Sequence, residues 1–175
     1  PVPAAGADAP AVPMAPGMVP LTDGTLWLAA LVLAAANFMA VLDMTVANVS
    51  VPSIAGNLGA TTSQGTWVIN SYAVAEAITV PLTGWLASRF GAVRVFATSM
   101  ALFGLASLLC GMANSLGMLV FARILQGLAG GPLMPLSQSL LLRIFPPHMA
   151  PAAIGLWAMT TLIAPVLGPI VGGWI

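Results

Sequence analysis

Charge is what this chain of 175 residues lacks most, since charged residues make up only 5% of it. An average soluble domain carries about a quarter. Lysine is absent, and four arginines balance four acidic residues, so there is no basic surface for nucleic acid. With 59% hydrophobic residues and a mean hydropathy of +1.03, the composition excludes a soluble globular domain and indicates an integral protein of the lipid bilayer.

Residues that carry catalytic or metal chemistry are almost as scarce. Cys110 is the single cysteine, so the chain can form neither an internal disulfide nor a cysteine metal site. His148 is the single histidine and follows two prolines, as a solvated loop residue would. The sequence shows neither paired metal ligands nor a nucleophile at a plausible spacing from a histidine. We therefore expect no metal, no cofactor and no enzymatic activity.

Long apolar runs predict an all-α membrane fold. Residues 1–25 are rich in proline, alanine and glycine without apolar periodicity, which predicts a disordered tail. Five segments then have about the 20 residues that a spanning helix needs. They are Leu26–Val51, Trp67–Ala87, Val95–Ala113, Leu116–Leu142 and Ala152–Ile175. The fifth ends without a loop or flanking charge, so we expect residues 26–175 to be part of a longer protein.

Proline and arginine positions refine this picture. Pro52 is expected to end the first helix, and further prolines are expected to interrupt the second, fourth and fifth. Arg89, Arg94 and Arg143 fall on one side if the helices alternate in direction. Basic loops face the cytoplasm, so that side and the N-terminal tail are predicted to be cytoplasmic.

Three ionisable residues lie well inside the apolar segments: Asp43, Glu76 and Arg123. At 1.5 Å per residue each lies roughly 10–13 Å from the same membrane surface. A buried carboxylate is expensive, and it usually has a charged partner or carries a proton. We expect Arg123 to pair with Asp43 through a bidentate contact, while Glu76 modulates the pair or carries a proton itself. The alternative is a static network, or an aspartate that only ties two helices together.

Amide side chains in the same helices are candidates for lining a polar cavity. Asn37 and Asn48 are eleven residues apart and so share one face of the first helix. Gln126 lies beside Arg123 on the fourth helix, and Gln138 follows towards the predicted cytoplasmic side. These four residues are predicted to face the interior of a bundle.

Taken together, four stretches resemble the major facilitator superfamily, and within it the drug:proton antiporters that have fourteen membrane-spanning helices. The first is Leu42-Asp43-x-Thr45-Val46-x-Asn48, and the third is Arg123-x-x-Gln126-Gly127. Between them lies a loop motif, Gly84 to Gly91 with Arg89, followed by Arg94. The fourth resembles the antiporter motif of the fifth helix and comprises Gly155, Pro165, Gly168, Pro169, Gly172 and Gly173.

The resemblance implies the first five helices of an N-terminal bundle in a proton-driven multidrug exporter. It further implies a bacterial inner membrane, amphipathic or cationic drugs as substrates, and a possible periplasmic adaptor and outer-membrane channel as partners. Ser88 stands where the loop motif usually has aspartate, so the charge lock implied there is weaker or differently made. A different class of function also stays open, namely a five-helix membrane scaffold that does not transport.

Overall fold

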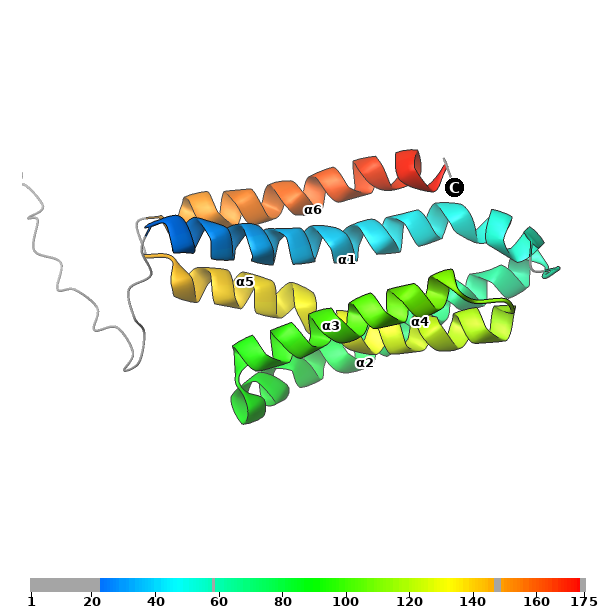
Figure 1. Cartoon of the computed structure of the whole chain (residues 1–175), viewed down its shortest axis with the longest axis horizontal. Coiled ribbons are helices and arrows are strands. Elements are labelled where there is room, and N and C mark those ends of the chain that lie inside the picture. The colour runs from blue at the N-terminus through cyan, green and yellow to red at the C-terminus, as the bar shows by residue number, and fades with distance from the viewer. Residues whose placement is uncertain (1–22, 58, 147–148, 174–175) are drawn as a thin grey trace, which may run out of the picture.

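The computed structural model describes residues 23–57, 59–146 and 149–173, and all regular structure within these ranges is α-helical (Figure 1). The predicted all-α class is confirmed for this part of the chain. His148, residues 1–22 and residues 174–175 lie outside the described ranges. The helices are α1 (Asp23–Asn57), α2 (Thr62–Phe90), α3 (Ala92–Gly111), α4 (Leu116–Gly130), α5 (Leu133–Ile144) and α6 (Ala150–Gly172).

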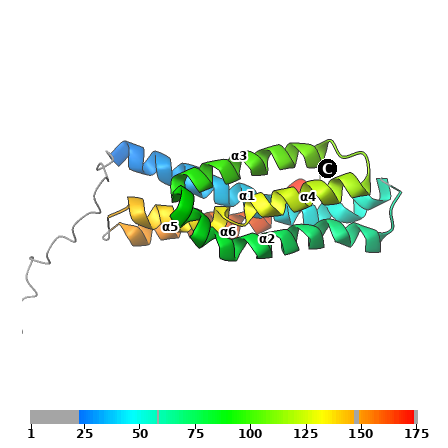
Figure 2. The ribbon, with the colours of Figure 1, turned by 90° about the horizontal axis from the view of Figure 1, so that it is seen from below.

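The helices run along one long axis, as both side views show (Figures 1 and 2). The most extensive contacts join α1 to α6 and α2 to α4, and α3 packs mainly on α4. The α5 helix continues the direction of α4 and lies against α1. The α1 and α4 helices, which carry two of the charged candidates, both contact α2 and α5 but pack little against each other.

Two helices extend beyond their predicted bounds. The α1 helix begins at Asp23, inside the predicted tail, and continues past Pro52 to Asn57. A proline removes only one backbone hydrogen bond, which a membrane helix tolerates. The α2 helix begins early because Thr61 and Gln64 form a capping box, in which each side chain bonds the other residue's backbone N–H.

The fourth predicted helix is broken in two, and this break was only partly anticipated. The α4 helix ends at Gly130 and α5 begins at Leu133, with Gly131 and Pro132 between them. Gly131 and Pro132 keep right-handed helical backbone angles, but Pro132 has no N–H to donate, so regular helical hydrogen bonding is interrupted here. By contrast, α2 continues through Pro81, and α6 continues through Pro165 and Pro169. The prediction that these prolines interrupt their helices was wrong.

Large apolar side chains cover the outside of the bundle. Leu28, Leu108, Leu162 and Val166 are each exposed by more than three fifths. Four helical stretches in the described residues are long and apolar enough to cross a membrane: Gly24–Val51, Ala92–Gly111, Leu116–Ile144 and Ala150–Gly172. The α2 helix is long enough, with 29 residues, but is more polar. Its crossing of the membrane therefore stays a prediction.

Candidate transport site

An ion pair joins α1 to α4. Nη1 of Arg123, on α4, donates a hydrogen bond to Oδ2 of Asp43, on α1, at 2.6 Å. The side chain of Arg123 is 10% exposed and that of Asp43 is 19% exposed. Both residues lie within stretches apolar enough to span a membrane. Two opposite charges held this close satisfy each other where water is scarce, so the pair links α1 to α4.

The contact differs from the bidentate geometry expected from the sequence. Only one pair of atoms, Nη1 and Oδ2, is in hydrogen-bonding contact, and the buried Nε of Arg123 has no partner among the described residues. A cavity of about 10 Å³ lies beside Arg123 and is lined also by Asn48 and Tyr72. This volume is close to what one water molecule needs. The pair is thus a single charge-assisted bond next to a very small cavity with a mostly apolar lining.

Glu76 does not join this pair. It is half-buried on α2, and in the described part of the chain its carboxylate has no hydrogen bond or ion pair. Its backbone packs against Gly127, which lies one turn along α4 from Arg123. The equal-depth estimate placed Glu76 about one helical turn too close to the pair. The second carboxylate is therefore separate from the first, although it belongs to the same interface.

Tyr72 is a site residue that sequence reasoning missed. It is the single tyrosine of the chain and lies one turn before Glu76 on the same face of α2. The side chain is buried, lies within electrostatic reach of Asp43, Glu76 and Arg123, and helps to line the small cavity. A phenol was overlooked because the sequence analysis considered only charged and amide side chains within the helices. Its uniqueness and its spacing from Glu76 were the signals that could have found it.

The four amide candidates do not line one cavity. Asn37 is buried, and its Nδ2 donates to Oγ1 of Thr161 at 2.8 Å, which ties α1 to α6. Gln126 is buried beside α3, where Sγ of Cys110 donates to its Oε1 at 3.4 Å. Asn48 and Gln138 are exposed. Of the four, only Asn48 borders the small cavity beside Arg123.

Glycines on α4 bring α2 close to the ion pair. A Cβ added to Gly127 would contact the carbonyl oxygen of Tyr72 and lie 2.9 Å from the Cβ of Ala75. A Cβ added to Gly130 would lie 2.9 Å from the hydroxyl oxygen of Tyr72. Small residues allow membrane helices to approach until their backbones touch. These two glycines therefore place Tyr72 and Glu76 near Arg123.

Two glycines of the antiporter motif do the same between α6 and α1. A Cβ on Gly168 would collide with the side chain of Thr45, two residues from Asp43. A Cβ on Gly172 would lie 3.3 Å from the hydroxyl oxygen of Ser50, which donates to the carbonyl oxygen of Gly172 at 3.4 Å. Gly155 has open space around it, and Pro165, Pro169 and Gly173 are exposed. Within the motif, Gly168 and Gly172 thus pack against α1, whereas the other four residues do not.

The loop motif forms the turn between α2 and α3. Gly91 has a φ of 90°, a conformation that favours glycine, and it ends α2 and starts α3 without an intervening loop. Gly84 has open space around it. Arg89 and Arg94 are exposed and form no ion pair within the described ranges. Within the described residues these two arginines therefore form no charge lock, and a differently made one stays a prediction.

Comparison with known proteins identifies the class of this protein. Residues 33–175 match the sequence family described as Major Facilitator Superfamily. The chain is 55% identical over 156 residues to the multidrug export protein EmrB of Haemophilus influenzae and 54% identical to EmrB of Escherichia coli K12. It is 58% identical over 156 residues to the fatty acid resistance protein FarB of Neisseria gonorrhoeae. Each match covers 89% of this chain and 30–31% of the relative.

The chain belongs to the major facilitator superfamily, a family of multi-pass membrane transporters and not of enzymes. The predicted family is confirmed, and the stretch from Gly130 to Ser139 looks similar to EmrB in particular. The chain spans about a third of the length of the curated relatives it matches. Because the chain is only about a third as long as these transporters, the substrates and the proton coupling of the whole protein do not follow from the match.

Proposed function

We propose that this chain supplies the first helices of the N-terminal bundle of a proton-driven multidrug exporter. The observation that carries the proposal is the Asp43–Arg123 ion pair, placed between two apolar helices. A charge pair inside the membrane is costly to keep, and acidic residues there commonly serve proton relays. The printed names of the relatives, multidrug export proteins among them, support the same activity.

Proton coupling follows from what protonation does to the pair. A proton on Oδ2 of Asp43 removes the charge that holds Arg123, so the contact between α4 and α1 weakens. Arg123 is then a buried cation without a counter-charge, and this state favours a rearrangement of the two helices. Return of the carboxylate charge restores the contact. Asp43 is the proton carrier in this scheme, and Arg123 is the group that senses its charge.

Substrates and surroundings belong to the same proposal. The exporter acts on amphipathic or cationic drugs in a bacterial inner membrane, with the N-terminus in the cytoplasm and a periplasmic adaptor and outer-membrane channel as partners. The arginines of the α2–α3 turn and of the end of α5 support this orientation, because basic residues gather on the cytoplasmic side. Since FarB is named for fatty acid resistance, a fatty acid is the second substrate to test.

A chimera tests the proposal directly. The matched 156 residues of Escherichia coli EmrB are replaced by their counterparts from this chain, and export of a cationic dye is followed in inside-out membrane vesicles. We expect dye transport that stops when a protonophore collapses the proton gradient. The unmodified Escherichia coli protein is the positive control. Transport that persists in the presence of the protonophore would refute proton coupling, and a folded but inactive chimera would refute the assignment to this exporter.

A further inference from the structure

A second cavity lies on another side of the bundle. It has a volume of about 780 Å³ and is formed by the end of α2, the length of α3, and α4 up to Pro132. This volume is within the range of small-molecule sites, roughly 300–1,000 Å³. Leu128 and Pro132 lie roughly 140–180° around the helix axis from Arg123, at 100° per residue. The cavity therefore faces away from α1 and is separate from the ion pair.

Small and large side chains alternate to give this cavity the shape of an open groove. Its floor consists of buried residues, among them Ser99, Ala106 and Ala129. Its walls include Leu102 and Leu105, which are 57% and 59% exposed. Because short side chains lie between rows of long ones, the groove runs along α3. Its apolar walls suit a hydrocarbon chain, and its position within the apolar α3 span places it in the membrane.

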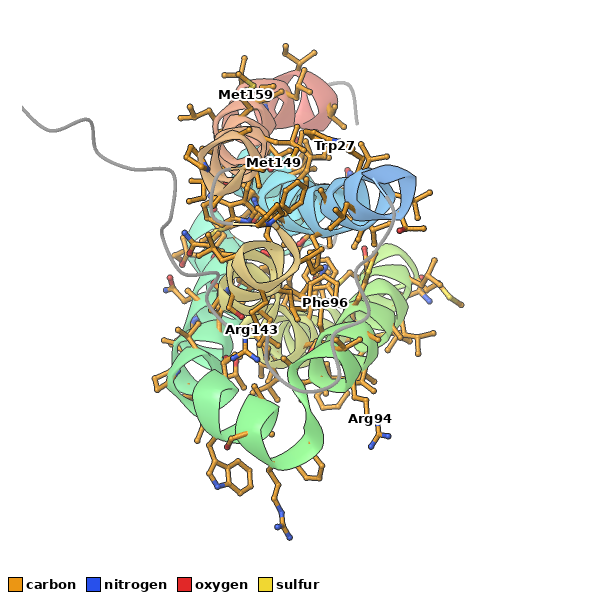
Figure 3. The ribbon with its side chains drawn as sticks, turned by 90° about the vertical axis from the view of Figure 1, so that its left-hand side faces the viewer. Trp27, Arg94, Phe96, Arg143, Met149 and Met159 are labelled. Carbon is orange, nitrogen blue, oxygen red and sulfur yellow. The ribbon has the colours of Figure 1, made fainter. Side chains whose placement is uncertain are left out.

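One end of the groove carries a positive charge. Arg94 is the charged residue among those that line it, and Figure 3 shows its side chain pointing outward at the rim of the bundle. It is exposed and has no ion pair in the ranges that the structure describes. Position 88, beside Arg89, is a serine and carries no charge, and Asp43 is already paired with Arg123. The guanidinium is thus free to bind an anion from outside the chain.

We propose that the groove binds an anionic phospholipid of the surrounding bilayer, with an acyl chain along α3 and the headgroup phosphate on Arg94. The distance along α3 from Arg94 to Leu105 is roughly 16 Å, about the depth of one leaflet of a 30 Å hydrocarbon core. Guanidinium groups bind phosphate oxygens well, and basic pockets between membrane helices select anionic headgroups. The proposal goes beyond the transport function, and its test does not depend on transport.

Lipid retention measures the charge requirement. The purified 175-residue chain is incubated with phosphatidylglycerol or phosphatidylcholine, and bound lipid is counted by native mass spectrometry. We expect a preference of about fivefold for phosphatidylglycerol, the effect of one arginine near a charged surface. Arg94→Gln should abolish this preference, while Arg89→Gln, which alters an arginine outside the groove, should keep it. Equal retention of both lipids, or equal effects of the two variants, would overturn the proposal.

The groove itself requires a second pair of measurements. Ser99→Leu fills the floor and should lower retention of both lipids, while circular dichroism checks that the helices are kept. A photoreactive probe on Leu105→Cys, in a Cys110→Ala background of the EmrB chimera, reports what covers the groove in a longer protein. Cross-linking to lipid supports the proposal. Cross-linking to another helix of the transporter, or lipid retention unchanged by Ser99→Leu, would reject it.

Discussion

Nη1 of Arg123 lies 2.6 Å from Oδ2 of Asp43, a contact between residues 80 positions apart in the sequence. Both side chains are largely buried, and Glu76, the other acid within the helices near them, has no ion pair among the described residues. Neither charge therefore has a ready substitute partner. Removal of one charge leaves the other buried without a counter-charge. Single substitutions at either position should therefore destabilise the protein.

Asp43→Asn should destabilise the bundle and abolish proton-driven export. The amide keeps the shape of the carboxylate but leaves Arg123 as an unpaired buried cation, at a cost of about 3–5 kcal/mol for a dry pair. Because Asp43 is 19% exposed, we expect the lower end of this range. Thermal unfolding in detergent and dye export by the EmrB chimera measure the two effects. Leu31→Ala, which alters an exposed residue of the same helix outside the site, is the control. Unchanged proton-dependent export by Asp43→Asn would return Asp43 to a purely structural role.

Arg123→Lys should be milder than Asp43→Asn. The structure has a single Nη1–Oδ2 contact, and one N–H of an ammonium group can reproduce such a contact where it could not reproduce a bidentate one. We expect an unfolding temperature between those of the unaltered protein and Asp43→Asn, with reduced but measurable export. If Arg123→Lys is as unstable as Asp43→Asn, more than one guanidinium N–H takes part in the contact.

The orientation of the chain can be read from two single cysteines. Ala60 lies between α1 and α2, and Ser88 lies near the turn between α2 and α3 that also carries Arg89. In a Cys110→Ala background, a membrane-impermeant maleimide added to intact cells should label Ala60→Cys from the periplasmic side. Ser88→Cys should react only after the inner membrane is opened. The reverse pattern would invert the proposed topology.

The pairing of α1 with α4 was predictable because charges are so rare. Three ionisable residues lay deep in apolar segments, and simple counting put Asp43 and Arg123 at similar depth. Electrostatics then left few alternatives, and the structure brings these two together. The single Nη1–Oδ2 contact, in place of the expected bidentate one, was not predictable, since the geometry depends on the angle between the two helices. The position of Glu76 was missed by a turn because depth was counted from the predicted ends of the helices.

Helix ends and burial were harder to predict, for a related reason. Pro52 and Pro81 lie within helices, whereas Pro132 follows two glycines at the only proline-associated break in the described residues. The local sequence shows a missing donor in each case but not how the neighbouring helices restrain the backbone. Likewise, Asn37 and Asn48 share a face by periodicity, yet only Asn37 is covered by α6. Burial depends on the partner helix, which a single-helix pattern does not describe.

Gly168→Ala should disturb the ion pair through α1, and Gly155→Ala should not. A Cβ on Gly168 would collide with the side chain of Thr45, two residues from Asp43, and would lie 3.3 Å from the carbonyl carbon of Thr45. One helix must then move away from the other, and overpacking of this kind costs about 1–3 kcal/mol. At Gly155 nothing lies within 4 Å, so alanine there should be neutral or stabilising, by up to about 1 kcal/mol.

A double substitution separates steric conflict from a general loss of packing. Thr45→Ala removes the hydroxyl oxygen that an alanine at position 168 would meet but keeps the Cβ of residue 45, so Thr45→Ala combined with Gly168→Ala should regain part of the lost stability. Thermal unfolding of the four proteins of this cycle gives the coupling energy, and dye export by the EmrB chimera should recover in parallel. Strictly additive losses would show that Gly168 acts independently of Thr45. If stability recovers but export does not, the Thr45 hydroxyl has a role in transport of its own. Its packing against Gly168 would then not be its only role.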